Sequence, residues 1–188
     1  PKKLIIIEKD YNLTNILKKK YKHNKNIEVN GDDIFNFKLD KFKNLVIISN
    51  LPYNISTKII LHLYKFNKNI DEMIFMVQKE VAIKFDYNLP KMNKYKFLTR
   101  VVSSYTRCFD VSSNVFFPKP KVKSSIVKFH FNKEIIDLKK ANYFSTKIFK
   151  NVRKKIHNNL NTNIDNNLFD RRVNQLNIDE LISIYDLF

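Results

Sequence analysis

The sequence predicts an α/β protein in which strands and helices alternate before a final group of helices. Short apolar runs recur along the first part of the chain, and most lead into a segment with helical spacing of its apolar residues. After about residue 133 only the helical spacing continues. This order is typical of a sheet covered by helices, followed by a small helical lobe. We therefore expect two domains, residues 1–132 and residues 133–188.

Composition supports a folded core and excludes some classes of protein. The chain has 188 residues, of which 44% are hydrophobic and 13% aromatic, enough to form a core. The single Cys108 excludes an internal disulfide, and the four histidines have no Cys or carboxylate at metal-ligand spacing, so no metal is expected. No run approaches 18 apolar residues, and no signal peptide opens the chain. We expect a soluble, cytoplasmic protein with no membrane partner.

The charge indicates a polyanionic partner. Lys and Arg number 35 against 18 Asp and Glu, which gives a net charge of +17 and a pI near 9.8. Such a charge favours salt-sensitive binding to nucleic acid. Lysine and asparagine abound throughout while glycine is almost absent, so compositional bias is a second source of the charge.

The first elements are expected to form a strand, a helix and a second strand. Residues 4–7 predict a buried strand, and Asp10 is a candidate N-cap for a helix. That helix carries Leu13, Ile16 and Leu17 on one face. A short strand at residues 27–29 closes at residues 30–33, which contain the only glycine of the chain.

The middle of the chain repeats this pattern. Residues 45–49 predict a buried strand that ends at Asn50-Leu51-Pro52-Tyr53, followed by a helix from Ser56 or Thr57. Residues 73–77 predict another buried strand, which leads into a helix from Lys79.

The last elements are a helix, two strands and the helical lobe. We expect a helix over residues 95–104 and strands over residues 105–111 and 122–131, which flank a Pro- and Lys-rich loop. A helical apolar stripe then runs beside basic side chains from Ile148 to Leu160. Asn177 and Glu180 form a capping box for the final helix.

Polar side chains follow three successive strands: Glu8, Asp32 and Asn50. In open α/β sheets, ligands gather at the carboxyl ends of strands, where an acidic residue can accept hydrogen bonds from ribose hydroxyls. An Asp at the next strand end can accept a hydrogen bond from an adenine amine. Asn50, with the proline and the aromatic ring that follow it, is suited to hold a planar, amine-bearing substrate. Each residue alone is more often a cap or turn residue, but their order favours a site.

Longer motifs extend this pattern, and together they resemble a known family. The matching segments are Asn50-Leu51-Pro52-Tyr53-Asn54-Ile55-Ser56-Thr57, Gln78-Lys79-Glu80-Val81-Ala82, residues 116–125 (FFPKPKVKSS) and a basic helix from Phe149 to Leu160. Their order and spacing resemble the small-subunit ribosomal RNA adenine dimethyltransferases (the KsgA type). The resemblance implies a Rossmann-like methyltransferase sheet and S-adenosyl-L-methionine as cofactor. It also implies dimethylation of adenines in 16S-type ribosomal RNA during ribosome biogenesis, by a monomer that acts on the small-subunit precursor.

The resemblance further implies roles for individual residues. The catalytic turn would be Asn50, Leu51, Pro52 and Tyr53, with Tyr53 and Phe116 stacking on the target base. The cofactor would be bound by Glu8, Lys9, Asp32, Asp33 and Asn50. The ribosomal RNA phosphates would be contacted by Lys119, Lys121, Lys123, Arg153, Lys154, Lys155 and Arg172.

The family's chemistry gives Asn50 a physical purpose. An aryl amine donates its lone pair into the ring and is therefore a poor nucleophile. The Asn50 side chain and the Leu51 carbonyl would accept hydrogen bonds from the amine and aim its lone pair at the methyl group. No strong base is needed before attack, because the amine proton becomes acidic only after transfer. Pro52 has no N–H and restrains the turn.

The chain also departs from the family pattern. It lacks the family's first strand and glycine-rich loop, whose glycines have no substitute elsewhere. That strand would be central, so its neighbours would lose a hydrogen-bonding partner. We expect a fragment rather than a degenerate remnant, and we expect that this chain alone binds S-adenosyl-L-methionine poorly and transfers no methyl groups. Residues 95–98 lack the family's glycine after the aromatic residue, which alters local packing only.

Two rival interpretations remain open. The large-subunit ribosomal RNA adenine methylases of the antibiotic-resistance type share the NxPY tetrad and the F-x-P-x-P-K loop, but Leu51 and residues 78–82 favour the small-subunit enzyme. The second rival is a non-catalytic RNA-binding or assembly factor on the same fold, which includes descendants such as a mitochondrial transcription factor. The intact tetrad argues against lost catalysis, whereas the missing loop argues for it.

Overall fold

The computed structural model describes residues 2–132, 136–162, 164 and 166–188. The chain divides into two compact units, Pro1–Phe42 and Lys43–Phe188, so the contacts separate it earlier than the domain boundary expected from the sequence. That expected boundary, after residue 132, adjoins residues 133–135, which lie outside the described residues. The boundary therefore stays a prediction.

The first unit contains a parallel pair of strands joined by a helix. Strand β1 (Leu4–Ile7) pairs with β2 (Ile27–Asn30), and α1 (Tyr11–Lys20) connects them. The predicted N-cap is confirmed, because the Asp10 carboxylate accepts a hydrogen bond from the Leu13 amide at 2.8 Å. Three lysines occupy the last turn of α1, where they complement the helix dipole.

Burial in this unit is lower than the sequence predicted. Three residues of β1 are half-buried and Leu4 is exposed, so the prediction of a buried strand was wrong in its burial and right in its conformation. Leu13 and Ile16 of α1 are 50% and 59% exposed. Within the unit, two short strands and one helix provide too little surface to cover these side chains.

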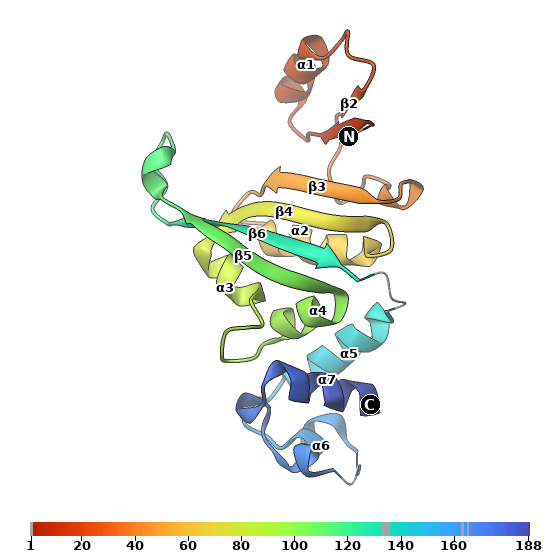
Figure 1. Ribbon diagram of the computed structural model, residues 1–188, viewed down its shortest axis with the longest axis vertical. Helices are drawn as coiled ribbons and strands as arrows, with labels where there is room; N and C mark the ends of the chain where they lie inside the picture. Colours follow the sequence, from red (N-terminus) through yellow and green to blue (C-terminus); the bar gives the residue numbers. More distant parts are fainter. Residues whose placement is uncertain (1, 133–135, 163, 165) are drawn as a thin grey trace. The chain divides into compact units, whose positions relative to one another are not determined.

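The second unit is built on a four-stranded mixed sheet of order β3-β4-β6-β5 (Figure 1). Its strands are β3 (Leu45–Asn50), β4 (Ile70–Gln78), β5 (Ser103–Val111) and β6 (Ser124–Phe131). Strand β3 is parallel to β4, whereas β6 is antiparallel to both β4 and β5. The turn after β3 and the loop before β6 therefore lie at the same end of the sheet.

Helices α2 (Ser56–Leu63), α3 (Lys79–Phe85) and α4 (Lys94–Val102) cover one face of this sheet (Figure 1). Alternate residues of the central strands point into the core between them: Met73, Phe75, Val77, Val127, Phe129 and Phe131. Helix α4 ends two residues before the predicted position because Ser103 and Ser104 pair with β6.

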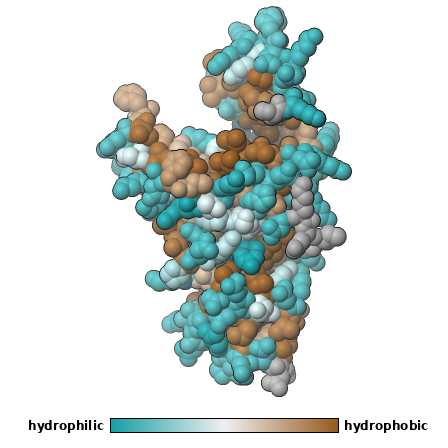
Figure 2. Space-filling model, viewed as in Figure 1, coloured by the Kyte–Doolittle hydropathy of each residue, from teal (hydrophilic) through white to brown (hydrophobic). Residues whose placement is uncertain are grey.

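The opposite face of the sheet is less covered at β3. Within this unit β3 is an edge strand, and Val46 and Ile48 are 57% and 73% exposed. Figure 2 shows the hydrophobic surface along this strand. The strand was predicted correctly, but its burial was not, because alternate side chains face away from the helices.

The C-terminal helices are α5 (Leu138–Ile148), α6 (Ile156–Leu160) and α7 (Ile178–Leu187). Helices α5 and α7 pack on α4 through aromatic rings. The Phe97 ring lies 5.0 Å from that of Phe144 and 5.4 Å from that of Tyr185. Short 3-10 helices complete the described chain: Leu39–Lys41, Tyr64–Phe66, Ser113–Val115 (η3), Asn167–Asp170 and Val173–Gln175.

The predicted basic helix from Phe149 to Leu160 was wrong over residues 149–155, and only its last five residues are helical. The chain leaves helical geometry after Ile148, and α6 starts only at Ile156. The intervening backbone pairs with a distant segment, because the Asn174 amide donates to the Val152 carbonyl at 3.2 Å. The Asn159 side chain donates to the carbonyls of Ile148 and Asn151, which replaces the helical hydrogen bonds there.

The predicted capping box of the last helix is confirmed. The Asn177 side chain accepts a hydrogen bond from the Glu180 amide at 2.9 Å, and the Glu180 carboxylate accepts one from the Asn177 amide at 2.9 Å. The second bond, with an ion pair to Arg171, lowers the pKa of Glu180. Among the described residues no helix is long and apolar enough to cross a membrane.

Candidate substrate and cofactor sites

The turn at Asn50–Tyr53 is fixed to the end of β4. Asn50 pairs in register with Met76, and the Leu51 amide donates to the Met76 carbonyl at 3.1 Å. The Leu51 side chain is 4% exposed, whereas Asn50 is exposed. The buried leucine anchors the turn, and the amide of Asn50 is presented at the carboxyl end of the strand.

The start of α2 closes the turn from the other side. The Ile55 amide donates to the Pro52 carbonyl at 3.2 Å, and the Ser56 hydroxyl donates to the Tyr53 carbonyl at 3.3 Å. Ile55 is the N-cap, and Ser56 is the first helical residue. Ser56 therefore holds the turn as a donor rather than acting as the cap.

Tyr53 links this turn to β6. Its hydroxyl lies 2.7 Å from the hydroxyl of Ser124, which is fully buried as the first residue of β6. No sequence pattern indicated this contact, although Ser124 directly follows the Pro- and Lys-rich motif. The contact places Tyr53 at the end of the loop that carries Phe116.

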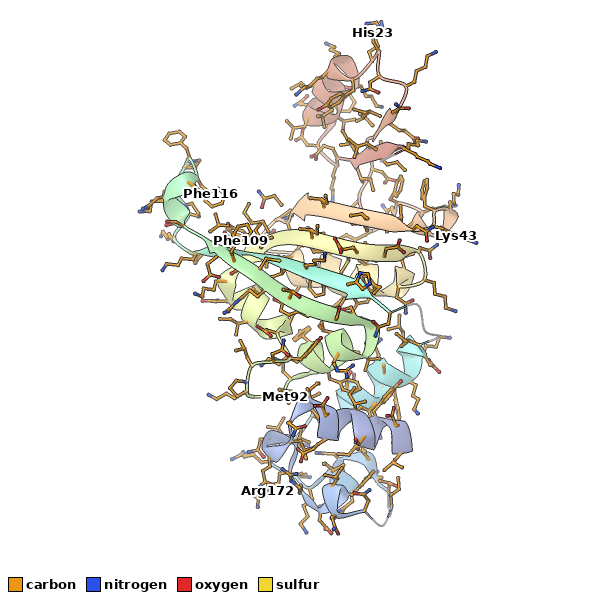
Figure 3. All side chains as sticks on the ribbon, viewed as in Figure 1. His23, Lys43, Met92, Phe109, Phe116 and Arg172 are labelled. Carbon is orange, nitrogen blue, oxygen red and sulfur yellow. The ribbon has the colours of Figure 1, made fainter. Side chains whose placement is uncertain are left out.

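That loop, residues 112–123, we call the aromatic loop. Phe116 directly follows η3 in this loop (Figure 3). Phe116 is half-buried and Phe117 is fully exposed, so neither ring belongs to the core. The stacking role predicted for Phe116 stays a prediction.

The four predicted cofactor residues of the first unit lie together, at the carboxyl ends of β1 and β2. The Lys9 ammonium contacts the Asp33 carboxylate at 2.7 Å, and this hydrogen bond raises the pKa of Lys9. One Glu8 carboxylate oxygen accepts a hydrogen bond from the Asp10 amide at 2.8 Å, and Asp32 accepts one from the Asp33 amide at 2.7 Å. Asn50 belongs to the other unit, and its place beside these residues stays a prediction.

A cavity of about 230 Å³ lies at the same ends of these strands, lined by Lys9, Tyr11, Thr14, Asn15, Lys18 and Gly31. A Cβ added to Gly31 would lie 3.0 Å from the Thr14 methyl group. Glycine therefore permits the close packing of this turn on α1.

The predicted phosphate-binding residues form two groups. Three lie exposed in the aromatic loop: Lys119, Lys121 and Lys123. The others form the lobe cluster: Arg153, Lys154, Lys155 and Arg172. Backbone pairing brings the two segments of this cluster together, because Lys155 forms an isolated antiparallel bridge with Arg172. The Lys155 ammonium also pairs with Asp170 at 3.0 Å, which lowers the pKa of Asp170.

In the part of the chain that the structure describes, no group of three or more His, Cys, Asp or Glu side chains could hold a metal ion.

The sequence matches known proteins along nearly its whole length. The sequence model of the family described as "Ribosomal RNA adenine dimethylase" matches residues 1–186. Ribosomal RNA small subunit methyltransferase A of Malacoplasma penetrans is 38% identical, over 85% of this chain and 60% of that protein. Proteins of the same name from Mycoplasma capricolum and Buchnera aphidicola are 34% and 36% identical, over 98% of this chain and 78% and 73% of theirs. The chain thus spans 60–78% of the length of these relatives.

Two solved structures share the fold. The 23S rRNA methyltransferase ErmE superposes with a TM-score of 0.78 at 17% identity, over 98% of this chain and 81% of that one. A dimethyladenosine transferase from Plasmodium falciparum gives 0.77 at 20% identity, over 99% and 82%. The fold is therefore a Rossmann-like methyltransferase fold, and the match over residues 1–186 shows that this chain belongs to the ribosomal RNA adenine dimethylase family.

Proposed function

We propose that the protein containing this chain dimethylates adenines of small-subunit ribosomal RNA, with S-adenosyl-L-methionine as methyl donor, during ribosome biogenesis. It would act in the cytoplasm as a monomer. The observation that carries this proposal is the turn at Asn50–Tyr53. There an exposed amide follows a strand end, and a tyrosine is hydrogen-bonded to the end of the aromatic loop.

The residues of the first unit fit the proposed cofactor. When bound, S-adenosyl-L-methionine supplies an electrophilic methyl group on a sulfonium. Glu8 would accept hydrogen bonds from its ribose hydroxyls, and Asp32 from the amine of its adenine. The Asp33 amide, which donates to the Asp32 carboxylate here, would be available to the adenine ring only if that carboxylate accepted from the adenine amine instead.

The residues of the turn would prepare the target amine. The side-chain oxygen of Asn50 and the carbonyl of Leu51 would each accept one N–H of the exocyclic amine. Both bonds favour a tetrahedral nitrogen, whose lone pair is then no longer delocalised into the ring and is free to attack the methyl group. Orientation of this kind can contribute several kcal/mol, up to about 7–11 kcal/mol in ideal cases.

Tyr53 and Phe116 would hold the base itself. A target adenine must leave its stack of neighbouring bases to reach the turn, and aromatic faces compensate for that unstacking. Each stacking interaction contributes about 1–3 kcal/mol. The hydrogen bond between Tyr53 and Ser124 supports this role, because it restrains one ring of the pair.

The helical segment after residue 132 would form an RNA-binding domain through the lobe cluster. Replacing Arg153 and Lys154 with glutamine in the complete protein should reduce the dependence of RNA affinity on salt. The slope of log K against log salt should fall by about 0.7 for each phosphate that is no longer neutralised. Filter binding at a series of salt concentrations measures this slope. Lys139→Gln, an exposed residue of α5 in the same lobe, is the control and should leave the slope unchanged. Equal slopes for all three proteins would contradict the assignment.

The substrate is tested with labelled methyl groups. The complete protein, given labelled S-adenosyl-L-methionine and unmethylated ribosomal subunits, should label the small subunit. Labelling of the large subunit alone would favour the large-subunit methylases instead. The chain of residues 1–188 by itself should transfer no methyl groups, because its only glycine, Gly31, cannot form a glycine-rich cofactor loop.

A further inference from the structure

Three polar side chains outside the proposed site hold both ends of the aromatic loop. The Lys79 ammonium, on the first residue of α3, donates to the Asp110 carboxylate at 2.5 Å. The other oxygen of that carboxylate accepts a hydrogen bond from the Ser125 hydroxyl at 2.7 Å. Asp110 lies near the end of β5 and Ser125 near the start of β6, so one carboxylate joins the two strands where the loop begins and ends.

A β-bulge turns Asp110 toward this position. In the pairing of β5 with β6, Arg107 is opposite Val127 and Phe109 is opposite Ile126, so Cys108 is the extra residue. One extra residue moves every later side chain of the strand to the opposite face. Phe109 therefore faces away from the helices and is 61% exposed, whereas Asp110 faces the side on which Lys79 lies.

The same cluster reaches the catalytic turn. The Lys79 amide donates to the carbonyl of Lys123, the last residue of the loop, at 3.0 Å. The next residue, Ser124, contacts the Tyr53 hydroxyl at 2.7 Å. Ser124 and Ser125 are both fully buried, so these contacts lie within the packed unit. A continuous series of bonds thus runs from Asp110 to Tyr53.

The cluster is better suited to orientation than to stability. The side chains of Lys79 and Asp110 are 39% and 37% exposed, and exposed ion pairs add little to folding stability. The hydrogen bonds from Lys79 and Ser125 lower the pKa of Asp110, so the carboxylate stays charged at neutral pH. A loop held at its two ends is displaced most near the middle of its length, and Phe116 lies there, directly after η3.

We propose that Lys79, Asp110 and Ser125 are positioning residues, which set the angle of the aromatic loop so that Phe116 faces Tyr53 across the target base. The expected effect on catalysis rests on the proposed function. The expected effect on the mobility of the loop does not depend on that function. The two effects can therefore be measured separately.

The effect on the loop is measured by limited proteolysis of the complete protein. Trypsin can cleave after Lys121 and Lys123 but not after Lys119, which precedes Pro120. Asp110→Asn and Lys79→Met should both speed cleavage at these two sites, as followed by mass spectrometry. Lys79→Arg, which keeps a charged donor, should restore the slow rate. The control is Lys128→Met, which removes the ion pair of a similarly exposed lysine, to Glu72, on the other face of the same sheet.

The effect on catalysis is measured by methyl transfer with the same proteins. Asp110→Asn and Lys79→Met should each lower kcat by roughly 10–100-fold, as expected when a reacting group is misplaced by about 1 Å. The KM for RNA should change little, and the melting temperature should match that of Lys128→Met. The double variant should lose no more than either single one, because both act through one contact. If Asp110→Asn fails to fold, Lys79→Met carries the same test.

Cleavage rates equal to those of Lys128→Met would overturn the inference. The inference would also be overturned if the loss of kcat in the double variant equalled the product of the losses in the two single variants. If the unchanged protein transfers no methyl groups but cleavage still accelerates in the variants, the proposed function fails while the restraint on the loop stands.

Discussion

Replacing Asn50 with alanine in the complete protein is expected to reduce methyl transfer by about 10²–10³-fold, the usual effect of removing one group preoriented toward a reacting centre. Asn50 is exposed at the carboxyl end of β3, and its neighbour Leu51 is buried and bonded to β4. The amide is therefore held by the backbone rather than by its own contacts, so its loss should leave the turn intact. Single-turnover methyl transfer measures the change.

RNA binding separates this effect from a loss of folding or docking. Because the proposed phosphate contacts lie in the aromatic loop and the lobe cluster, Asn50→Ala should bind RNA as tightly as the unchanged protein. Asn88→Ala, another exposed asparagine of the second unit, is the matched control and should keep full activity. Undiminished methyl transfer by Asn50→Ala would refute the role assigned to the amide.

Replacing Phe129 with alanine is expected to lower the free energy of unfolding of the second unit by about 3–5 kcal/mol. Phe129 is fully buried on β6, and its ring lies 5.0 Å from that of Tyr105 and 5.9 Å from that of Phe85. It also contacts the rings of Tyr64 and Phe75, at 6.1 and 6.3 Å. Removing it leaves a cavity among four aromatic rings that cannot collapse without moving both central strands.

Urea unfolding followed by circular dichroism measures this loss. Phe109→Ala is the control, because the same side chain on β5 is 61% exposed, and its removal should change the free energy by no more than about 0.5 kcal/mol. Similar losses for the two variants would show that the ring cluster is not the centre of the core. Since β4 and β6 carry the contacts of Leu51 and Tyr53, the Phe129 variant should also lose methyl transfer on mild heating.

Sequence patterns predicted correctly those features that depend on residues close together in the chain. The cap at Asp10 and the capping box of Asn177 and Glu180 are of this kind, since each bond joins residues three positions apart. In β6, Val127, Phe129 and Phe131 alternate in the sequence with Lys128 and His130, and the three apolar residues are buried. The helix expected from Phe149 failed for the opposite reason, because its backbone pairs with Arg172 and Asn174, a pairing that apolar spacing does not encode.

Motifs located the candidate site without showing how its parts meet. The sequence singled out Asn50–Tyr53 and the loop with Phe116, but the bond between Tyr53 and Ser124 joins residues 71 positions apart. The bond between Lys79 and Asp110 spans 31 positions and depends on a bulge, which shifts the register without changing the composition of the strand. Such contacts follow from strand pairing and are therefore seen only in the folded chain.

The central claim is that the turn at Asn50–Tyr53 directs a methyl group to the exocyclic amine of adenine in small-subunit ribosomal RNA. The most direct test is to incubate the complete protein with labelled S-adenosyl-L-methionine and unmethylated small subunits, and then to digest the RNA to nucleosides. We predict that the label elutes with adenosine methylated on its exocyclic nitrogen, and that Asn50→Ala lowers the rate at which this peak appears by about 10²–10³-fold. Label on any other nucleoside, or no label while the RNA is bound, would contradict the claim.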